Sequence, residues 1–199
     1  MTDANTFPHP ILITGGAGFL GSHMMALCLE KKVRVVVIDN LSNSDLSNLQ
    51  TLEKHFNVTI PFFNIDIRDK NRLKQFFKEH QFSAVIHFAG LKSVSESVAN
   101  PDLYFENNVT GSQNLIGFIK EFDAILLDLW LSDSTAEESL EAIAGQAFRG
   151  QIVLISGLDN EALEDACEKG RRLGLRVNGF LRKPVDVESL KALLADLEY

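Results

Sequence analysis

The sequence of 199 residues has little of what several classes of protein require. Its two cysteines, Cys28 and Cys167, lack CxxC or metal-ligand spacing, so no disulfide framework is indicated and both are expected to be buried thiols. No apolar run approaches the roughly 20 residues of a membrane helix, and the polar start has no secretory signal pattern. The net charge is −8 without clustered lysine or arginine, which argues against nucleic-acid binding. We therefore expect a cytoplasmic protein that binds neither membranes nor nucleic acids.

Short apolar, β-branched runs alternate with helical stretches, a pattern typical of a parallel sheet covered by helices on both faces. The expected strands span residues 11–14, 33–39, 60–67, 84–88, 124–129, 151–156 and 178–181. The expected helices span residues 18–31, 46–55, 70–80, 103–121, 136–146, 161–173 and 187–197. With right-handed crossovers, the pattern predicts a Rossmann-like, doubly wound α/β/α fold of about seven strands in the order 3-2-1-4-5-6-7. No linker interrupts the chain near residue 121, so residues 1–199 are expected to form a single α/β domain.

Three glycines, Gly15, Gly18 and Gly21, stand at GxxGxxG spacing after the first expected strand and at the opening of a helix. Glycine there permits a tight turn and a close approach of the backbone to a pyrophosphate, and the helix N-terminus offers N–H groups and a positive dipole. Asp39 ends the second strand, where a carboxylate can accept both ribose hydroxyls and repel a 2′-phosphate. The pattern predicts an adenine-dinucleotide site that prefers NAD over NADP. The alternative is a glycine turn without a ligand.

Residues 10–120 resemble the N-terminal part of UDP-glucose 4-epimerases, members of the extended short-chain dehydrogenase/reductase family. The resemblance rests on residues 14–23, 39–44, 66–67, 87–94, 96–97 and 107–111. It implies contacts to NAD in four groups. The pyrophosphate would lie at Gly15, Gly18, Phe19, Leu20 and Gly21; the ribose at Asp39, Asn40, Leu41, Ser42, Asn43 and Ser44; the adenine at Asp66 and Ile67; and the nicotinamide at Phe88, Ala89, Gly90, Lys92 and Asn107. Lys92 could instead be a surface lysine, and His23 and His87 are expected to pack or cap.

The catalytic part of that family is missing from the sequence. By the resemblance, a Tyr-x-x-x-Lys helix should follow the next strand, but the two tyrosines, Tyr104 and Tyr199, have no lysine four residues on. The sugar-nucleotide domain that normally follows is missing as well. Loss of one acid–base group costs roughly 10²–10⁴-fold in rate. The sequence therefore predicts no catalytic residue, no metal site and no enzyme.

Residues 122–199 resemble the later part of a response-regulator receiver domain, which has a flavodoxin-like fold. Asp128, Ser156 and Lys183 take the places of its phosphoacceptor, its conformational hydroxyl and its cation. Receivers also need Mg²⁺, held by acidic residues of a first strand that this chain lacks, so this group is expected to be inactive. Charge changes at the same point, from 11 Lys and Arg against 12 Asp and Glu in residues 1–122 to 8 against 15 in residues 123–199.

The leading hypothesis is an engineered, recombinantly expressed chimera: an epimerase-like NAD-binding half, residues 1–121, joined to a receiver-like half, residues 122–199. It would keep residual binding of NAD or adenine nucleotides, dominated by the adenosine half, because Leu129, Trp130 and Leu131 replace the serine-rich stretch beside the nicotinamide. Two alternatives stay open. One is an NAD-dependent UDP-glucose 4-epimerase-type enzyme, and the other is a phosphoacceptor signalling domain. The oligomeric state is not indicated.

Overall fold

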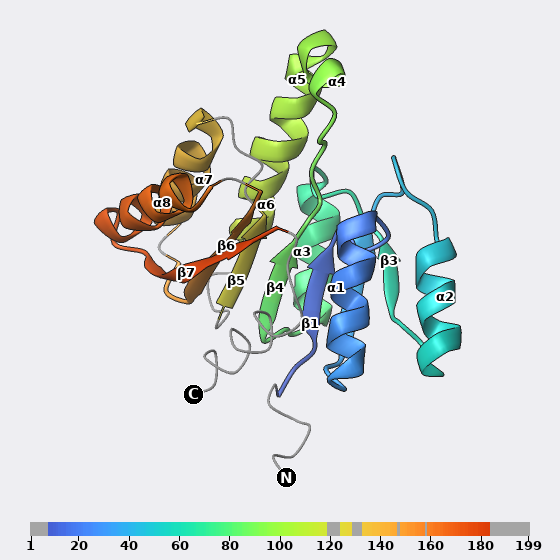
Figure 1. Cartoon of the computed structure of the whole chain (residues 1–199). Helices are drawn as coiled ribbons and strands as arrows, with labels where there is room; N and C mark the ends of the chain where they lie inside the picture. Colours follow the sequence, from blue (N-terminus) through green and yellow to red (C-terminus); the bar gives the residue numbers. More distant parts are fainter. Residues whose placement is uncertain (1–7, 119–123, 129–132, 147, 158, 184–199) are drawn as a thin grey trace.

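Seven parallel strands form one continuous sheet in the order β3-β2-β1-β4-β5-β6-β7 (Figure 1). The computed structural model describes residues 8–118, 124–128, 133–146, 148–157 and 159–183. The strands are β1 (Ile11–Thr14), β2 (Val35–Asp39), β3 (Phe62–Asn64), β4 (Ala84–His87), β5 (Ala124–Asp128), β6 (Gln151–Ser156) and β7 (Arg176–Arg182). The predicted Rossmann-like fold and strand order are therefore confirmed.

The sheet continues from β4 to β5, on the two sides of the point where the chain was expected to change character. Ala84 lies opposite Ala124 and His87 opposite Leu127, in unbroken parallel register. The next strand, β6, pairs with all five residues of β5. Both parts of the chain thus contribute neighbouring strands to one sheet.

Three strands differ in length from the prediction by more than one residue. The start of β2 is delayed to Val35 because the Val33 N–H donates to the Cys28 carbonyl of the preceding helix, at 2.9 Å. The edge strand β3 is short and begins after Pro61, which has no N–H to donate. The last strand is longer than predicted, with Asn178 as an extra residue between the pairs of Val177 and Gly179.

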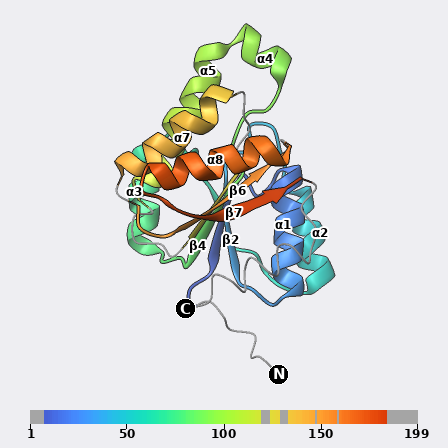
Figure 2. The ribbon, with the colours of Figure 1, turned by 60° about the vertical axis from the view of Figure 1, so that its left-hand side comes forward.

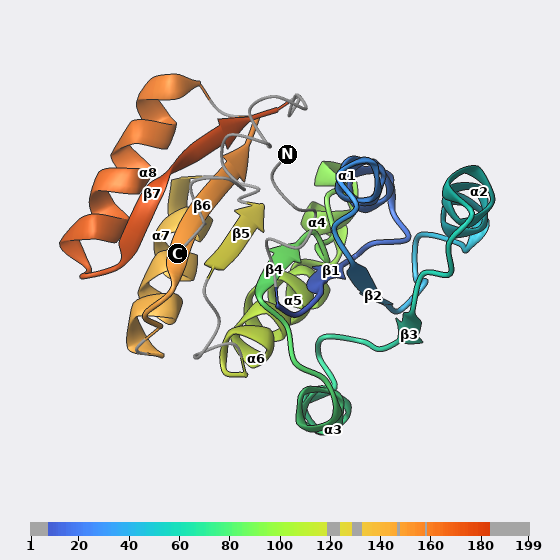
Figure 3. The same ribbon diagram turned by 90° about the horizontal axis from the view of Figure 1, so that it is seen from below.

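Helices cover both faces of the sheet (Figure 3). One core lies under α1 (Phe19–Glu30) and α2 (Ser47–Phe56), where Met25, Cys28 and Leu49 pack on Ile13 and Val37. The other core lies under α3 (Lys70–Glu79), α6 (Ser112–Ile116), α7 (Asp133–Gly145) and α8 (Asn160–Arg172). Alternate strand residues supply the two cores, as the pleat of a doubly covered sheet requires.

The segment predicted as one helix over residues 103–121 is divided. It contains α5 (Pro101–Phe105), a π-helical turn η1 (Glu106–Gly111) and then α6, and a further helix α4 (Val94–Ala99) precedes it. Pro101 opens α5, a position where its missing N–H costs nothing, and the Ser93 hydroxyl accepts the Glu96 N–H at the start of α4. Helices α4 and α5 form an arm that projects beyond the carboxyl ends of the strands (Figure 2). The helix predicted over residues 187–197 lies outside the described residues.

The two cysteines are buried and not disulfide-bonded, as predicted. Burial raises the pKa of the Cys28 thiol to about 12, so it stays protonated and unreactive at neutral pH. Within the described ranges, no helix is long and apolar enough to cross a membrane.

Candidate functional site

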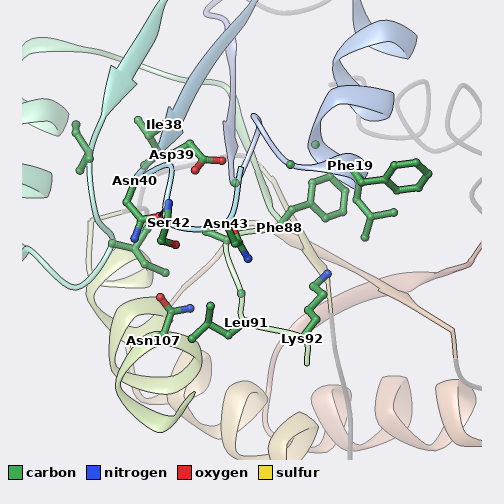
Figure 4. A pocket seen from close by; sticks show the side chains of 18 residues that line it. Phe19, Ile38, Asp39, Asn40, Ser42, Asn43, Phe88, Leu91, Lys92 and Asn107 are labelled. Atoms are coloured by element: carbon green, nitrogen blue, oxygen red, sulfur yellow. Dashed lines mark hydrogen bonds between the residues drawn. The ribbon is translucent and has the colours of Figure 1, made fainter. Parts of the chain in front are cut away.

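A cleft opens at the carboxyl ends of β1, β2 and β4, where ligands bind in doubly wound sheets (Figure 4). It is lined by Gly15, Gly18, Phe19, Leu20, Gly21, Ile38, Asp39, Asn40, Ser42, Asn43, Ile65, Ile67, Phe88, Ala89, Gly90, Leu91, Lys92 and Asn107. The structure thus brings together 15 of the 18 residues that the sequence assigned to the cofactor. Their assignment to particular parts of NAD stays a prediction.

The three glycines of the motif differ in whether the surrounding protein leaves space for a side chain. Gly15 has φ +68° and a Cβ there would lie 2.6 Å from the Ala89 nitrogen, while a Cβ at Gly21 would lie 2.4 Å from the Gly15 carbonyl oxygen. Both sites are closed to a side chain by backbone atoms. At Gly18 a Cβ would meet only the Gly15 oxygen, at 3.4 Å. Packing within the protein therefore demands glycine at Gly15 and Gly21, whereas at Gly18 it leaves room at the cleft wall.

The amino end of α1 faces the cleft. Gly18 is its N-cap and no side chain of the described residues caps it, and Phe19, Leu20 and Gly21 of the first turn line the cleft. The N–H groups of a first helical turn have no partner within the helix, and with the helix dipole they attract an anion. Phe19 is 73% exposed, and its ring packs on the His23 ring with the centroids 4.4 Å apart.

Asp39 ends β2 and is buried, with 7% of the residue exposed. Its Oδ2 accepts the Ala17 N–H at 3.0 Å, and its Oδ1 accepts the Leu41 N–H at 2.8 Å and the Ser44 hydroxyl at 3.1 Å. A carboxylate has about four lone-pair positions, so Oδ2 retains capacity for a further donor from a ligand. The three donors fix the direction of the carboxylate in the cleft.

Three residues assigned to the cofactor do not line the cleft. Leu41 has φ +56° and packs toward the core beneath α1, and Ser44 turns its hydroxyl to Asp39. Asp66 forms an ion pair with the Arg68 guanidinium at 2.6 Å and accepts a hydrogen bond from the Asn40 amide at 2.9 Å. The hydrogen bond from Arg68, followed by that from Asn40, lowers the pKa of Asp66 to about 2 against a smaller opposing effect of burial. Local hydrogen bonds and packing engage these residues, and their direct contact with the cofactor stays a prediction.

Sequence reasoning missed Ile38, Ile65 and Leu91, which also line the cleft. Their signal was their place in the sequence, since each adjoins or stands one position away from a residue that was assigned. Ile65 and Ile67 together give the β3 side of the cleft an apolar surface.

The opposite wall is the loop after β4, residues 88–92, together with the buried side chain of Asn107. Figure 4 shows the Lys92 amine directed toward the cleft. The alternative, a surface lysine that lies away from the site, is therefore wrong. His87 is buried at the end of β4 and hydrogen-bonded on both ring nitrogens, as a packed histidine.

The residues of the receiver resemblance lie at neighbouring strand ends. Asp128 ends β5, Ser156 ends β6 in a buried position, and the Lys183 N–H donates to the Ser156 carbonyl at 2.8 Å. Residues 129–132, with Trp130 and its neighbours Leu129 and Leu131, lie outside the described residues. In the described ranges, no group of three His, Cys, Asp or Glu side chains could hold a metal ion.

The fold and the glycine turn define a Rossmann-like α/β protein, and comparison with known proteins narrows the class. The family model described as GDP-mannose 4,6 dehydratase matches residues 12–137. The chain therefore belongs to the GDP-mannose 4,6 dehydratase family.

Particular relatives are UDP-glucose 4-epimerases. The enzyme of Neisseria meningitidis serogroup B is 49% identical over 102 residues, which are 51% of this chain and 30% of that protein. The solved enzyme of Bifidobacterium longum with NAD⁺ and UDP has a TM-score of 0.66 and 26% identity, covering 74% of this chain and 52% of that one. The Stenotrophomonas maltophila enzyme, with NAD and formylated UDP-arabinopyranose, has a TM-score of 0.65 and 28% identity over 74% and 52%. The matched segment spans about a third of the curated relatives' length.

These comparisons overturn the hypothesis of an engineered chimera without a catalytic site. The family match continues to residue 137, past the expected join, and the solved structures cover more of the chain than residues 10–120 contain. The receiver resemblance of residues 122–199 gains no support. Polar residues collect at the carboxyl ends of strands in doubly wound sheets generally, so three such residues do not identify a receiver.

The expectation that the protein is not an enzyme is contradicted too, because the relatives and the structural neighbours are named as enzymes. The expectation depended on two missing features, the Tyr-x-x-x-Lys motif and the sugar-nucleotide domain, whereas the family match includes every residue that lines the cleft.

Proposed function

We propose that this protein is an NAD-dependent enzyme of the UDP-glucose 4-epimerase type and that the cleft holds the dinucleotide. The observation that carries the proposal is the meeting of three features in one cleft: the uncapped amino end of α1, the oriented carboxylate of Asp39 and the loop with Lys92. A helix terminus suits a pyrophosphate, a carboxylate suits ribose hydroxyls, and a cation suits a polar or anionic group.

The cleft has room for the pyrophosphate where Gly18 lacks a side chain, since a Cβ there would fill space and touch only one protein atom. The adenosine would lie along Asp39 and the apolar side made by Ile65 and Ile67. The nicotinamide would lie toward Phe88, Lys92 and Asn107, on the opposite side. When bound, NAD supplies an acceptor for hydride from the sugar carbon, and this chain's residues orient it.

Tyr104 does not supply the base for the sugar proton. Its hydroxyl accepts the Ser93 N–H at 3.0 Å and donates to Glu96 at 2.9 Å, on the projecting arm. Loss of hydration, followed by the hydrogen bond to Glu96, raises the pKa of Tyr104, the opposite of what a base requires. Among the residues that the structure describes, no tyrosine lines the cleft.

Turnover of UDP-galactose to UDP-glucose in the presence of NAD tests the activity. We expect turnover by the native chain and its loss in Gly18→Val, whose side chain fills the proposed pyrophosphate position and whose Cβ would meet only the Gly15 oxygen. Absence of turnover by a folded chain that binds NAD would refute the activity while leaving the cofactor assignment standing.

A further inference from the structure

One helical segment, residues 106–116, touches both walls of the cleft, and we call it the bridging helix. It consists of η1 and α6 and lies beneath the loops that follow β3 and β4. Those strands are three places apart in the order β3-β2-β1-β4. At about 4.8 Å per strand, their loops are separated by roughly 14 Å, so they cannot hold each other by direct contact.

On the β4 side, Asn108 of the bridging helix grips a single residue of the loop. Its Oδ1 accepts the Leu91 N–H at 2.8 Å and its Nδ2 donates to the Leu91 carbonyl at 2.9 Å. The neighbouring Asn107 donates to the same Oδ1 at 2.9 Å and lines the cleft. Asn108 therefore satisfies both backbone groups of Leu91, as a paired strand would.

The π-helical form of η1 explains how two consecutive asparagines serve one loop. A π-turn holds one more residue than an α-turn and displaces side chains from α-helical positions, and such turns gather at functional sites. Here the displaced turn carries Asn107 into the cleft wall and Asn108 onto Leu91.

A chain of buried and partly buried hydrogen bonds connects the bridging helix to the glycine turn. The Ser112 hydroxyl donates to the Asn108 carbonyl at 2.7 Å, so it must accept from His87 Nε2, 2.8 Å away. His87 therefore carries its proton on Nε2, and Nδ1 accepts the Thr14 hydroxyl at 2.6 Å. Thr14 directly precedes Gly15, which connects the helix to the pyrophosphate end of the cleft.

On the β3 side, the same helix holds the other wall. The Asn114 amide shares its N–H groups between the carbonyls of Ile67, at 3.4 Å, and Arg68, at 3.3 Å. Gly111 packs so closely that a Cβ there would lie 2.8 Å from two Ile67 side-chain atoms.

We propose that the bridging helix positions the two walls of the cleft relative to each other, with Asn108 holding the nicotinamide wall and Asn114 the adenosine wall. The proposal rests on the proposed function for its ligand. Asn108 and Asn114 are positioning residues, because they act through Leu91 and through Ile67 and Arg68.

The test compares Asn108→Ala with Asn114→Ala by calorimetric titration with NAD and with ADP, which lacks the nicotinamide. Asn108→Ala should weaken NAD binding about tenfold, which is the equivalent of one or two hydrogen bonds. The affinity of the same variant for ADP should stay within about twofold of the native value. Asn114→Ala should lower the affinities for NAD and for ADP by similar factors. Gln113→Ala, an exposed site on the same helix, is the matched control and should change neither.

Amide hydrogen exchange gives a readout that does not depend on the ligand. The Leu91 amide should exchange at least about tenfold faster in Asn108→Ala, and Asn108→Asp, which keeps the acceptor, should restore its protection. Equal losses of NAD and ADP in Asn108→Ala, or unchanged Leu91 exchange, would overturn the positioning role. If the native chain bound neither nucleotide, the proposed function would fail, and the exchange result would still decide the contact.

Discussion

Single residues in the cleft divide into those that the fold needs and those that a ligand needs. Gly15 and Gly21 belong to the first kind, since backbone atoms occupy the space of their Cβ. Gly18 belongs to the second, with backbone angles of −73° and 177° that any residue adopts. Asp39 belongs to both, because it ties down the turn and also faces the cleft.

Gly18→Ala and Gly15→Ala should therefore behave differently. Gly18→Ala should lose no more than about 1 kcal/mol of stability, which is the typical disadvantage of alanine at an N-cap, while its affinity for NAD falls at least about tenfold. Gly15→Ala should lose at least about 2 kcal/mol of stability through positive φ and backbone overlap. Urea unfolding and calorimetric titration of both variants measure this. Equal stability losses in the two would contradict the division.

Asp66 makes stability depend on pH at the acid end. Its pKa is lowered from 3.8 to about 2 in the folded protein, chiefly by Arg68, so the folded state favours the charged form. The contribution is complete above pH 4 and is lost as the pH falls toward 2. We expect it to be about 1 kcal/mol after screening by solvent. In urea unfolding from pH 6 to 2, Asp66→Asn should lack this part of the slope. Parallel curves for the native chain and the variant would rule the contribution out.

At the scale of elements, the sequence predicted best where local pattern and long-range packing agree. The glycine spacing and the buried β-branched runs of β1 and β2 led to elements close to those observed. Residues 94–116 were misread because apolar spacing does not reveal a π-turn. That turn depends on long-range contacts, such as Asn108 with Leu91 and Gly111 with Ile67.

The same reason limited the prediction of the cleft. Motif positions predicted most of its lining residues. Asp66 instead pairs with Arg68, Leu41 packs against the core, and the Ser44 hydroxyl donates to Asp39. These partners are fixed only in the folded chain.

The contact of the bridging helix with the β3 loop gives a prediction at this scale. Gly111→Ala should destabilise the protein by about 1–2 kcal/mol, because overlap with Ile67 outweighs the gain in helix propensity. In an Ile67→Ala background the same change should be neutral or stabilising by up to about 1 kcal/mol. A double-mutant cycle by urea unfolding measures the coupling. Additive effects would show that the helix and the loop are not packed as described.

At the scale of the whole molecule, the two cores extend along the entire sheet. Leu12, Val85, Ile125 and Ile152, from four different strands, belong to one of them. No boundary separates the described residues before position 119 from those after 123, because β4 and β5 are paired neighbours.

We therefore predict that the chain unfolds as a single unit, as expected for one domain over residues 1–199. Differential scanning calorimetry should give one transition whose calorimetric and van't Hoff enthalpies agree. Leu126→Ala in β5 should lower the stability of the whole protein, by about 2–5 kcal/mol. Two transitions, with only one of them shifted by this variant, would show independent halves.

The most direct test of the central claim, that the cleft is an NAD site, is calorimetric titration of the native chain with NAD, NADP and ADP. We predict that NAD and ADP bind and that NADP binds more weakly, because the Asp39 carboxylate opposes a 2′-phosphate. Replacing the carboxylate in Asp39→Asn should reduce the difference in affinity between NAD and NADP. Binding of none of the three ligands, or tighter binding of NADP than of NAD, would contradict the assignment of the cleft.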